Sequence, residues 1–148
     1  MKRVSKASWP FGLKPYLWRG SEPVSNRKIG MEFRAIGETE IAEVIADGIV
    51  VNSVEDGVDL IGNVYYRGFD KVILYQENVS PDFFDLKTGM AGEILQKFSN
   101  YRVRLAIVGD FSGYTSNALR DFIRESNTGK LVNFLSSKEE AVNSLSAG

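Results

Sequence analysis

The sequence contains no cysteine and no histidine. Without cysteine the chain can form neither a disulfide framework nor a thiolate nucleophile. Without histidine it lacks the commonest general base at neutral pH and the commonest transition-metal ligand. Together these absences exclude zinc fingers, Cys–His and Ser–His–Asp catalysis, and haem ligation through His or Cys. Any chemistry must use carboxylates, lysine, arginine, tyrosine or hydroxyl groups, and we expect no resident cofactor or metal.

Long apolar runs are also missing. No stretch of the chain approaches the roughly 20 apolar residues that a membrane-spanning helix needs. The N-terminal residues do not form the apolar core of a signal peptide. We therefore expect a cytoplasmic protein without a membrane span. The apolar residues that are present make up 43% of the chain, which suffices for one folded domain of this length.

Proline is scarce after residue 30, because three of the four prolines lie before it. Residues 1–30 show no periodicity and hold seven of the 18 basic residues but only one of the 19 acidic residues. We interpret residues 1–30 as a basic, flexible tail and residues 31–148 as a single domain. The acidic charge of that domain argues against a nucleic-acid groove on it. The tail itself could contact nucleic acid, an anionic surface or the domain.

Regular patterns begin at Met31. Alternation predicts strands at residues 31–36 and 41–46, joined by a turn. Asp47-Gly48 predicts a hairpin that leads to a short third strand at residues 49–51. A helix that begins at Asn52 or Ser53 and ends at Gly68 follows.

Three apolar runs, KVILY, VRLAIV and LVNFL, predict strands at residues 71–75, 103–108 and 131–135. Ser80-Pro81 predicts the start of one long helix that contains Gly89 and Gly92, where we expect close packing. Further helices are predicted at residues 116–125 and, after two capping boxes, through Leu145. The alternation predicts an α/β fold: a mixed, mostly parallel sheet of about five strands with helices packed against it.

The block FFDLKTGMAGEILQKFSNYRVRLAIVGDF, from Phe83 to Phe111, resembles a bacterial family catalogued only as a domain of unknown function. More distantly, the order of elements is similar to that of the STAS superfamily (sulfate transporter and anti-sigma-factor antagonist domains), especially its anti-anti-sigma branch. This resemblance implies a STAS-like fold and a regulatory binding module that is usually not an enzyme. Under this resemblance, the nearest match to the phosphate-accepting position of those domains is Thr88, which precedes Gly89.

Polar residues follow the two central strands at their carboxyl ends, where open α/β sheets bind ligands. If these strands are neighbours, we expect Glu77, Asp82 and Asp110 to converge. Such carboxylates could hold a hard cation, and helix N-termini at the same edge could hold an anion. Alternatively, hydroxyls such as that of Ser80 only cap helices, and Asp110 only orders a turn.

Phe83 and Phe84 are adjacent, so on a helix their rings point about 100° apart. Either both rings belong to the core, or one is partly exposed and, with Met90, lines a pocket or interface. The candidate ligand- or partner-binding residues are therefore Glu77, Ser80, Asp82, Phe84, Thr88, Met90, Asp110, Ser112 and Tyr114.

Three functions remain open. The leading hypothesis is a STAS-like regulatory or ligand-binding domain without catalytic activity, with a protein partner or a small ligand. The second is a carboxylate- and Mg²⁺-dependent enzyme at the strand-end crevice. The third is a homo-oligomeric interaction module, such as a homodimer, that uses the helix carrying Gly89 and Gly92.

Overall fold

The computed structural model describes residues 31–147, and within them five strands form one sheet in the order β1-β2-β3-β4-β5. β1 (Glu32–Ala35) runs antiparallel to β2 (Ile41–Ile45). β2, β3 (Lys71–Tyr75), β4 (Arg104–Val108) and β5 (Val132–Leu135) are parallel. The predicted fold class is confirmed, and the three apolar runs lie side by side. The predicted tail lies outside the described residues.

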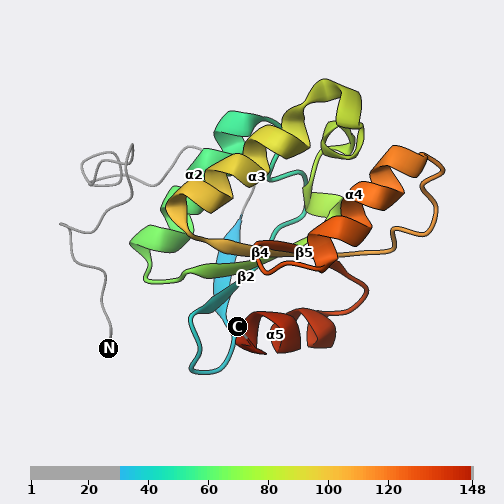
Figure 1. Cartoon of the computed structure of the whole chain (residues 1–148). Coiled ribbons are helices and arrows are strands. Elements are labelled where there is room, and N and C mark those ends of the chain that lie inside the picture. The colour runs from blue at the N-terminus through green and yellow to red at the C-terminus, as the bar shows by residue number, and fades with distance from the viewer. Residues whose placement is uncertain (1–30, 148) are drawn as a thin grey trace.

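Helices cover both faces of this sheet (Figure 1). α2 (Val54–Tyr66), α3 (Met90–Tyr101) and α4 (Asn117–Asn127) connect successive parallel strands. They share one face, because right-handed crossovers that advance in one direction place their helices on the same side. α5 (Lys138–Ala147) follows β5 and packs on the opposite face. The longest helix of residues 31–147, α2, has 13 residues, so none of them could cross a membrane.

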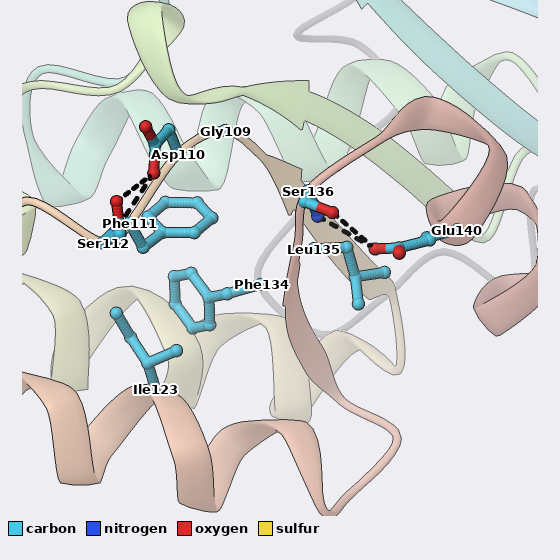
Figure 2. Close-up of a pocket in the computed structure, with 9 residues that line it drawn as sticks. All are labelled: Gly109, Asp110, Phe111, Ser112, Ile123, Phe134, Leu135, Ser136 and Glu140. Carbon is cyan, nitrogen blue, oxygen red and sulfur yellow. Dashed lines mark hydrogen bonds between the residues drawn. The ribbon is translucent and has the colours of Figure 1, made fainter.

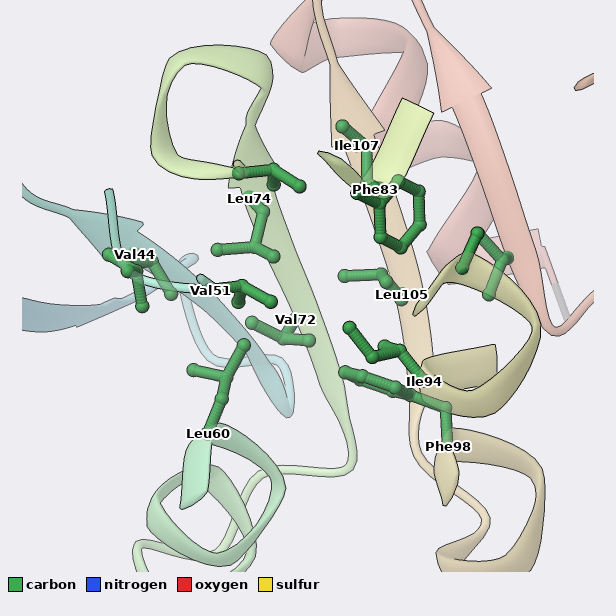
Figure 3. Packing of buried hydrophobic residues seen from close by; sticks show 14 of the residues in the cluster. Val44, Val51, Leu60, Val72, Leu74, Phe83, Ile94, Phe98, Leu105 and Ile107 are labelled. Carbon is green, nitrogen blue, oxygen red and sulfur yellow. The ribbon is translucent and has the colours of Figure 1, made fainter. Parts of the chain in front are cut away.

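Side chains of the central strands alternate between two apolar clusters, as the pleat of a strand requires. Val72 and Leu74 of β3 belong to the large cluster beneath α2, α3 and α4 (Figure 3). Ile73 points the other way and packs with Ala141 and Leu145 of α5. Burial on both faces therefore explains why the central strands are continuous apolar runs.

The hairpin expected at Asp47-Gly48 is wrong. β2 pairs with β1 on one side and β3 on the other, so it has no free edge for a third strand. Residues 46–51 instead cross the end of the sheet, where Val51 forms an isolated parallel bridge with Val79. The buried Asn78 holds this segment, since its side-chain amide donates to two of the segment's carbonyls at 3.2 and 2.9 Å.

The single long helix expected from Ser80 is also wrong. Two 3₁₀ turns, Pro81–Phe84 and Leu86–Thr88, precede α3. Gly89 adopts a left-handed backbone with φ of 77°, which ends the second turn and explains the glycine. Gly92 lies inside α3, but an added Cβ would meet no atom within 4 Å, so it is not a close-packing site. Apolar spacing of three residues fits a 3₁₀ turn as well as an α-helix, which is why the break was missed.

Candidate functional site

A pocket of about 710 Å³ lies at the carboxyl ends of β4 and β5 (Figure 2). The segment after β4 leads to α4 on one face, whereas the segment after β5 leads to α5 on the other. Connections that leave neighbouring strands toward opposite faces open a crevice at the carboxyl end of a parallel sheet. The volume lies within the range of roughly 300–1,000 Å³ that small-molecule sites occupy.

Apolar side chains form the floor of the pocket. They are Phe111, Ile123, Phe134 and Leu135. The ring of Phe134 is buried and meets that of Phe111 edge to face, with 5.4 Å between ring centroids. Phe134 also contacts the rings of Phe84 and Phe122, so the floor continues into an aromatic cluster beneath α4. This packing makes the floor a rigid part of the core.

Two carboxylates, each bonded to a serine, line the pocket from opposite sides (Figure 2). Asp110 Oδ1 accepts hydrogen bonds from the hydroxyl and the backbone N–H of Ser112, at 2.6 and 3.0 Å. Glu140 Oε1 accepts the same two kinds of bond from Ser136, at 3.0 and 3.1 Å. The hydroxyl and then the backbone N–H of Ser112 hold the pKa of the Asp110 carboxyl below its ordinary value. That carboxylate is therefore ionised at neutral pH.

Gln76, which directly follows β3, fixes the wall that carries Asp110. Its side-chain oxygen accepts a hydrogen bond from the backbone N–H of Asp110 at 3.0 Å, and its amide donates to the Tyr114 hydroxyl at 2.9 Å. Gly109 makes room for this side chain. A Cβ at position 109 would lie 2.4 Å from Oε1 and 2.5 Å from Cβ of Gln76.

Comparison with known protein families assigns most of the chain to one family. A family described as "Domain of unknown function (DUF4180)" matches residues 36–145. The chain belongs to this family. No curated protein and no solved structure matches it. All the residues that line the pocket lie within the DUF4180 match.

Of the predicted site residues, Asp110 and Ser112 line this pocket of the DUF4180 domain. Tyr114 lies beside its wall, where its ring stacks on that of Phe84 with 5.2 Å between centroids. Glu77 lines a separate depression of about 250 Å³ at the ends of β2 and β3. The nine residues therefore do not form one site.

The remaining predicted residues belong to the turns before α3 or, for Met90, to its first turn. The Ser80 hydroxyl oxygen accepts a hydrogen bond from the backbone N–H of Asp82 at 3.1 Å. The Thr88 hydroxyl oxygen lies 2.9 Å from the Asp82 carbonyl oxygen and accepts from the backbone N–H of Met90 at 3.2 Å. Phe84 is 7% exposed and Met90 8%. Of the two alternatives for Phe83 and Phe84, the structure shows the one in which both rings belong to the core.

The expected convergence of Glu77, Asp82 and Asp110 on a hard cation is wrong as well. β3 and β4 are neighbours, as predicted. Within residues 31–147, however, no group of three or more acidic side chains could hold a metal ion. The connections after β3 and β4 lead to helices on the same face, and Gln76 bridges the two strand ends.

A buried polar cluster beneath α5 was not predicted. Glu43 of β2 is 4% exposed and accepts hydrogen bonds from the Tyr75 hydroxyl at 2.5 Å and from Lys138 Nζ of α5 at 3.0 Å. Burial acts to raise the pKa of Glu43, but the bonds from Tyr75 and Lys138 and the nearby basic charges outweigh it and lower the pKa. Burial and the adjacent Glu43 carboxylate raise the pKa of the Tyr75 hydroxyl. The cluster therefore ties α5, and with it Glu140, to the sheet.

Sequence reasoning also missed Ser136 and Glu140, which it assigned only to the cap of the last helix. The cap bond itself is made by Ser137, whose hydroxyl oxygen accepts a hydrogen bond from the backbone N–H of Glu140 at 3.1 Å. A usable signal existed: Ser136 follows the last strand just as Asp110 follows its neighbour. The position of Ser136 after the last strand points to a shared site only if α5 lies on the face of the sheet opposite α4.

Proposed function

We propose that this domain is a non-catalytic ligand-binding domain that takes a small molecule into the pocket between the ends of β4 and β5. The observation that carries the proposal is the pocket itself, which combines an apolar floor with a few polar groups. That combination is typical of small-molecule sites, where apolar surface supplies affinity and a few polar groups set orientation. Gln76 and the aromatic cluster hold both parts in place before any ligand arrives.

The chemistry of the lining favours binding over catalysis. Its titratable residues are Asp110 and Glu140, and each has one oxygen occupied by a serine. A general base works best with a pKa near the working pH. The pKa of Asp110 is shifted the other way, below its ordinary value. A permanently ionised carboxylate suits recognition of a ligand better than proton transfer.

A STAS-like regulatory role is part of the same proposal: ligand binding would change the affinity of the domain for a protein partner. The resemblance in element order supports this role. So does the exposed position of Thr88 at the start of α3, where the resemblance expects a phosphate-accepting residue. Phosphate at a helix N-terminus is electrostatically favoured.

Nuclear magnetic resonance of the ¹⁵N-labelled full chain with a library of small fragments tests the proposal. We expect fragments to shift the backbone amides of residues 109–112 and 135–136, and not those of Glu77 and Asn78. Leu135→Trp places a larger ring in the pocket and should abolish these shifts. Ile49→Trp is the matched control, because Ile49 is 39% exposed and lies outside the pocket. Fragments that bind only elsewhere, or bind the Leu135→Trp variant equally well, would refute the proposal.

A further inference from the structure

We infer that the pocket selects an organic cation with an apolar body, such as a primary amine attached to an aromatic or branched aliphatic group. The inference rests on the proposed ligand-binding function and adds the chemical class of the ligand. Four features of the pocket carry it: the sign of its charges, the state of its carboxylate oxygens, the aromatic floor and the rigidity of its walls.

The lining carries charge of one sign only. It contains two carboxylates, Asp110 and Glu140, and no lysine or arginine. An anionic ligand would meet two like charges without a compensating cation, which costs affinity. A cation meets an opposite charge at either side of the pocket, and electrostatic complementarity of this kind sets specificity.

Each carboxylate also keeps one oxygen available. The two serine bonds to Asp110 both use Oδ1, and the two serine bonds to Glu140 both use Oε1. Within residues 31–147, no hydrogen bond or ion pair uses Asp110 Oδ2 or Glu140 Oε2. An ammonium group has three N–H donors and no acceptor, so it can donate to either of these oxygens. Hydrogen bonds between charged partners of this kind are shorter and stronger than neutral ones.

The floor suits the rest of such a ligand. Phe111 and Phe134 present aromatic rings within the lining, beside the side chains of Ile123 and Leu135. Burial of an apolar body against these groups supplies affinity at about 25 cal/mol per Å² of surface removed from water. An aromatic ring within about 6 Å of a cation adds to the attraction. A small inorganic cation would use none of this apolar surface.

The walls are set before the ligand binds. Gln76 fixes the backbone N–H of Asp110, and Ser112 fixes its carboxylate. Glu140 lies in the first turn of α5, which the bond between Lys138 and the buried Glu43 ties to the sheet. A site whose groups are already in place loses less free energy to ordering when it binds.

Matched probes test the inference on the full-length protein. 4-Phenylbutylamine, 4-phenylbutanol and 4-phenylbutyrate share an apolar body and differ in charge, and methylammonium carries the charge without the body. Dissociation constants come from amide shifts at residues 109–112 and 135–136. We expect the amine to bind about three- to tenfold more tightly than the alcohol at low salt, the acid more weakly, and methylammonium not detectably. Added salt should narrow the gap between amine and alcohol.

Two isosteric variants test the assigned groups. Asp110→Asn and Glu140→Gln keep an oxygen that the serines can bond but remove the charge. At least one of the two should weaken amine binding about three- to fivefold and leave the alcohol unchanged. Glu139→Gln is the matched control, because Glu139 is the neighbouring acid on α5 and does not line the pocket.

The outcomes separate the inference from the proposed function. If the alcohol or the acid binds at the pocket as tightly as the amine, the inference is overturned while ligand binding stands. If the amine is preferred but all three acidic variants weaken it equally, Asp110 and Glu140 are not its partners and the inference also falls. If none of the probes shifts the pocket amides and a wider fragment library also fails there, the proposed function itself is refuted.

Discussion

Replacing Gly109 with alanine should disrupt the pocket wall through a contact that only this structure reveals. The added Cβ would lie 2.4 Å from Gln76 Oε1 and 2.5 Å from Gln76 Cβ. The second atom lies next to the backbone of Gln76, so rotating the far end of the side chain does not relieve the clash. Gln76 must move as a whole and give up its hydrogen bonds to Asp110 and Tyr114.

The magnitude follows from these two effects. Overpacking of a fixed site costs typically about 1–3 kcal/mol. Two lost hydrogen bonds cost about 0.5–1.5 kcal/mol each. The two costs overlap in part, because the movement of Gln76 that relieves the clash is the same movement that breaks its hydrogen bonds. We therefore expect Gly109→Ala to lower the free energy of unfolding by about 2–3 kcal/mol. Gly113→Ala, in the same loop, meets no atom within 4 Å and should be neutral or slightly stabilising.

Urea unfolding followed by far-ultraviolet circular dichroism measures both variants. Gln76→Gly provides the double-mutant cycle, because it removes both the side chain and its Cβ. In the Gln76→Gly background, Gly109→Ala should lower the free energy of unfolding only slightly. The coupling energy between the two substitutions should therefore be at least about 1 kcal/mol. Equal stabilities of Gly109→Ala and Gly113→Ala, or strict additivity with Gln76→Gly, would refute the reasoning.

Three further predictions concern other parts of the domain, each measured by urea unfolding. Asn78→Ala should lower the free energy of unfolding by about 1–3 kcal/mol, because two carbonyls of the crossing segment lose their buried donor. Asn52 is exposed, so Asn52→Ala should change the free energy of unfolding little. Arg104→Met should destabilise the domain more than Arg124→Met, because Arg124 is exposed. The Arg104 guanidinium donates to the carbonyls of Lys130, Ser144 and Leu145. The last two carbonyls lie at the C-terminal end of α5, where a cation is favourable. The folded pKa of Glu43 lies below its ordinary value of 4.5, so its ionised form stabilises the fold above that pH and the stabilisation is lost as pH falls through the folded pKa. The wild type should therefore lose more stability than Glu43→Gln between about pH 5 and pH 3, and parallel pH profiles would contradict this assignment.

The sequence predicted the layered fold because its strongest signals are local. KVILY can be buried on both faces only as a central strand, and the helices between the strands then follow from handedness. The two errors in the fold have different causes, one in tertiary pairing and one in the local backbone. Asp47-Gly48 is a good hairpin dipeptide, but β3 occupies the edge of β2 that the hairpin would need. The stripe from Phe83 to Phe98 looks helical, but Gly89 interrupts it.

The candidate site was harder to predict because it depends on which face each helix covers. Asp110 and Ser112 were found from their position after a strand. Their partners Ser136 and Glu140 were not, since the face that α5 covers is decided by packing of Ala141 and Leu145 against the sheet. Glu43 lies in a strand that was predicted only from its alternation, and its burial beneath α5 was not predicted.

A crystal structure of the full chain with 4-phenylbutylamine tests most directly the claim that the opposite exits of β4 and β5 create a ligand site. The account predicts the phenyl ring against Phe111, Phe134 and Leu135, with the ammonium within hydrogen-bond distance of Asp110 or Glu140. An amine bound in the depression beside Glu77, or a pocket filled by side chains in the crystal, would contradict it.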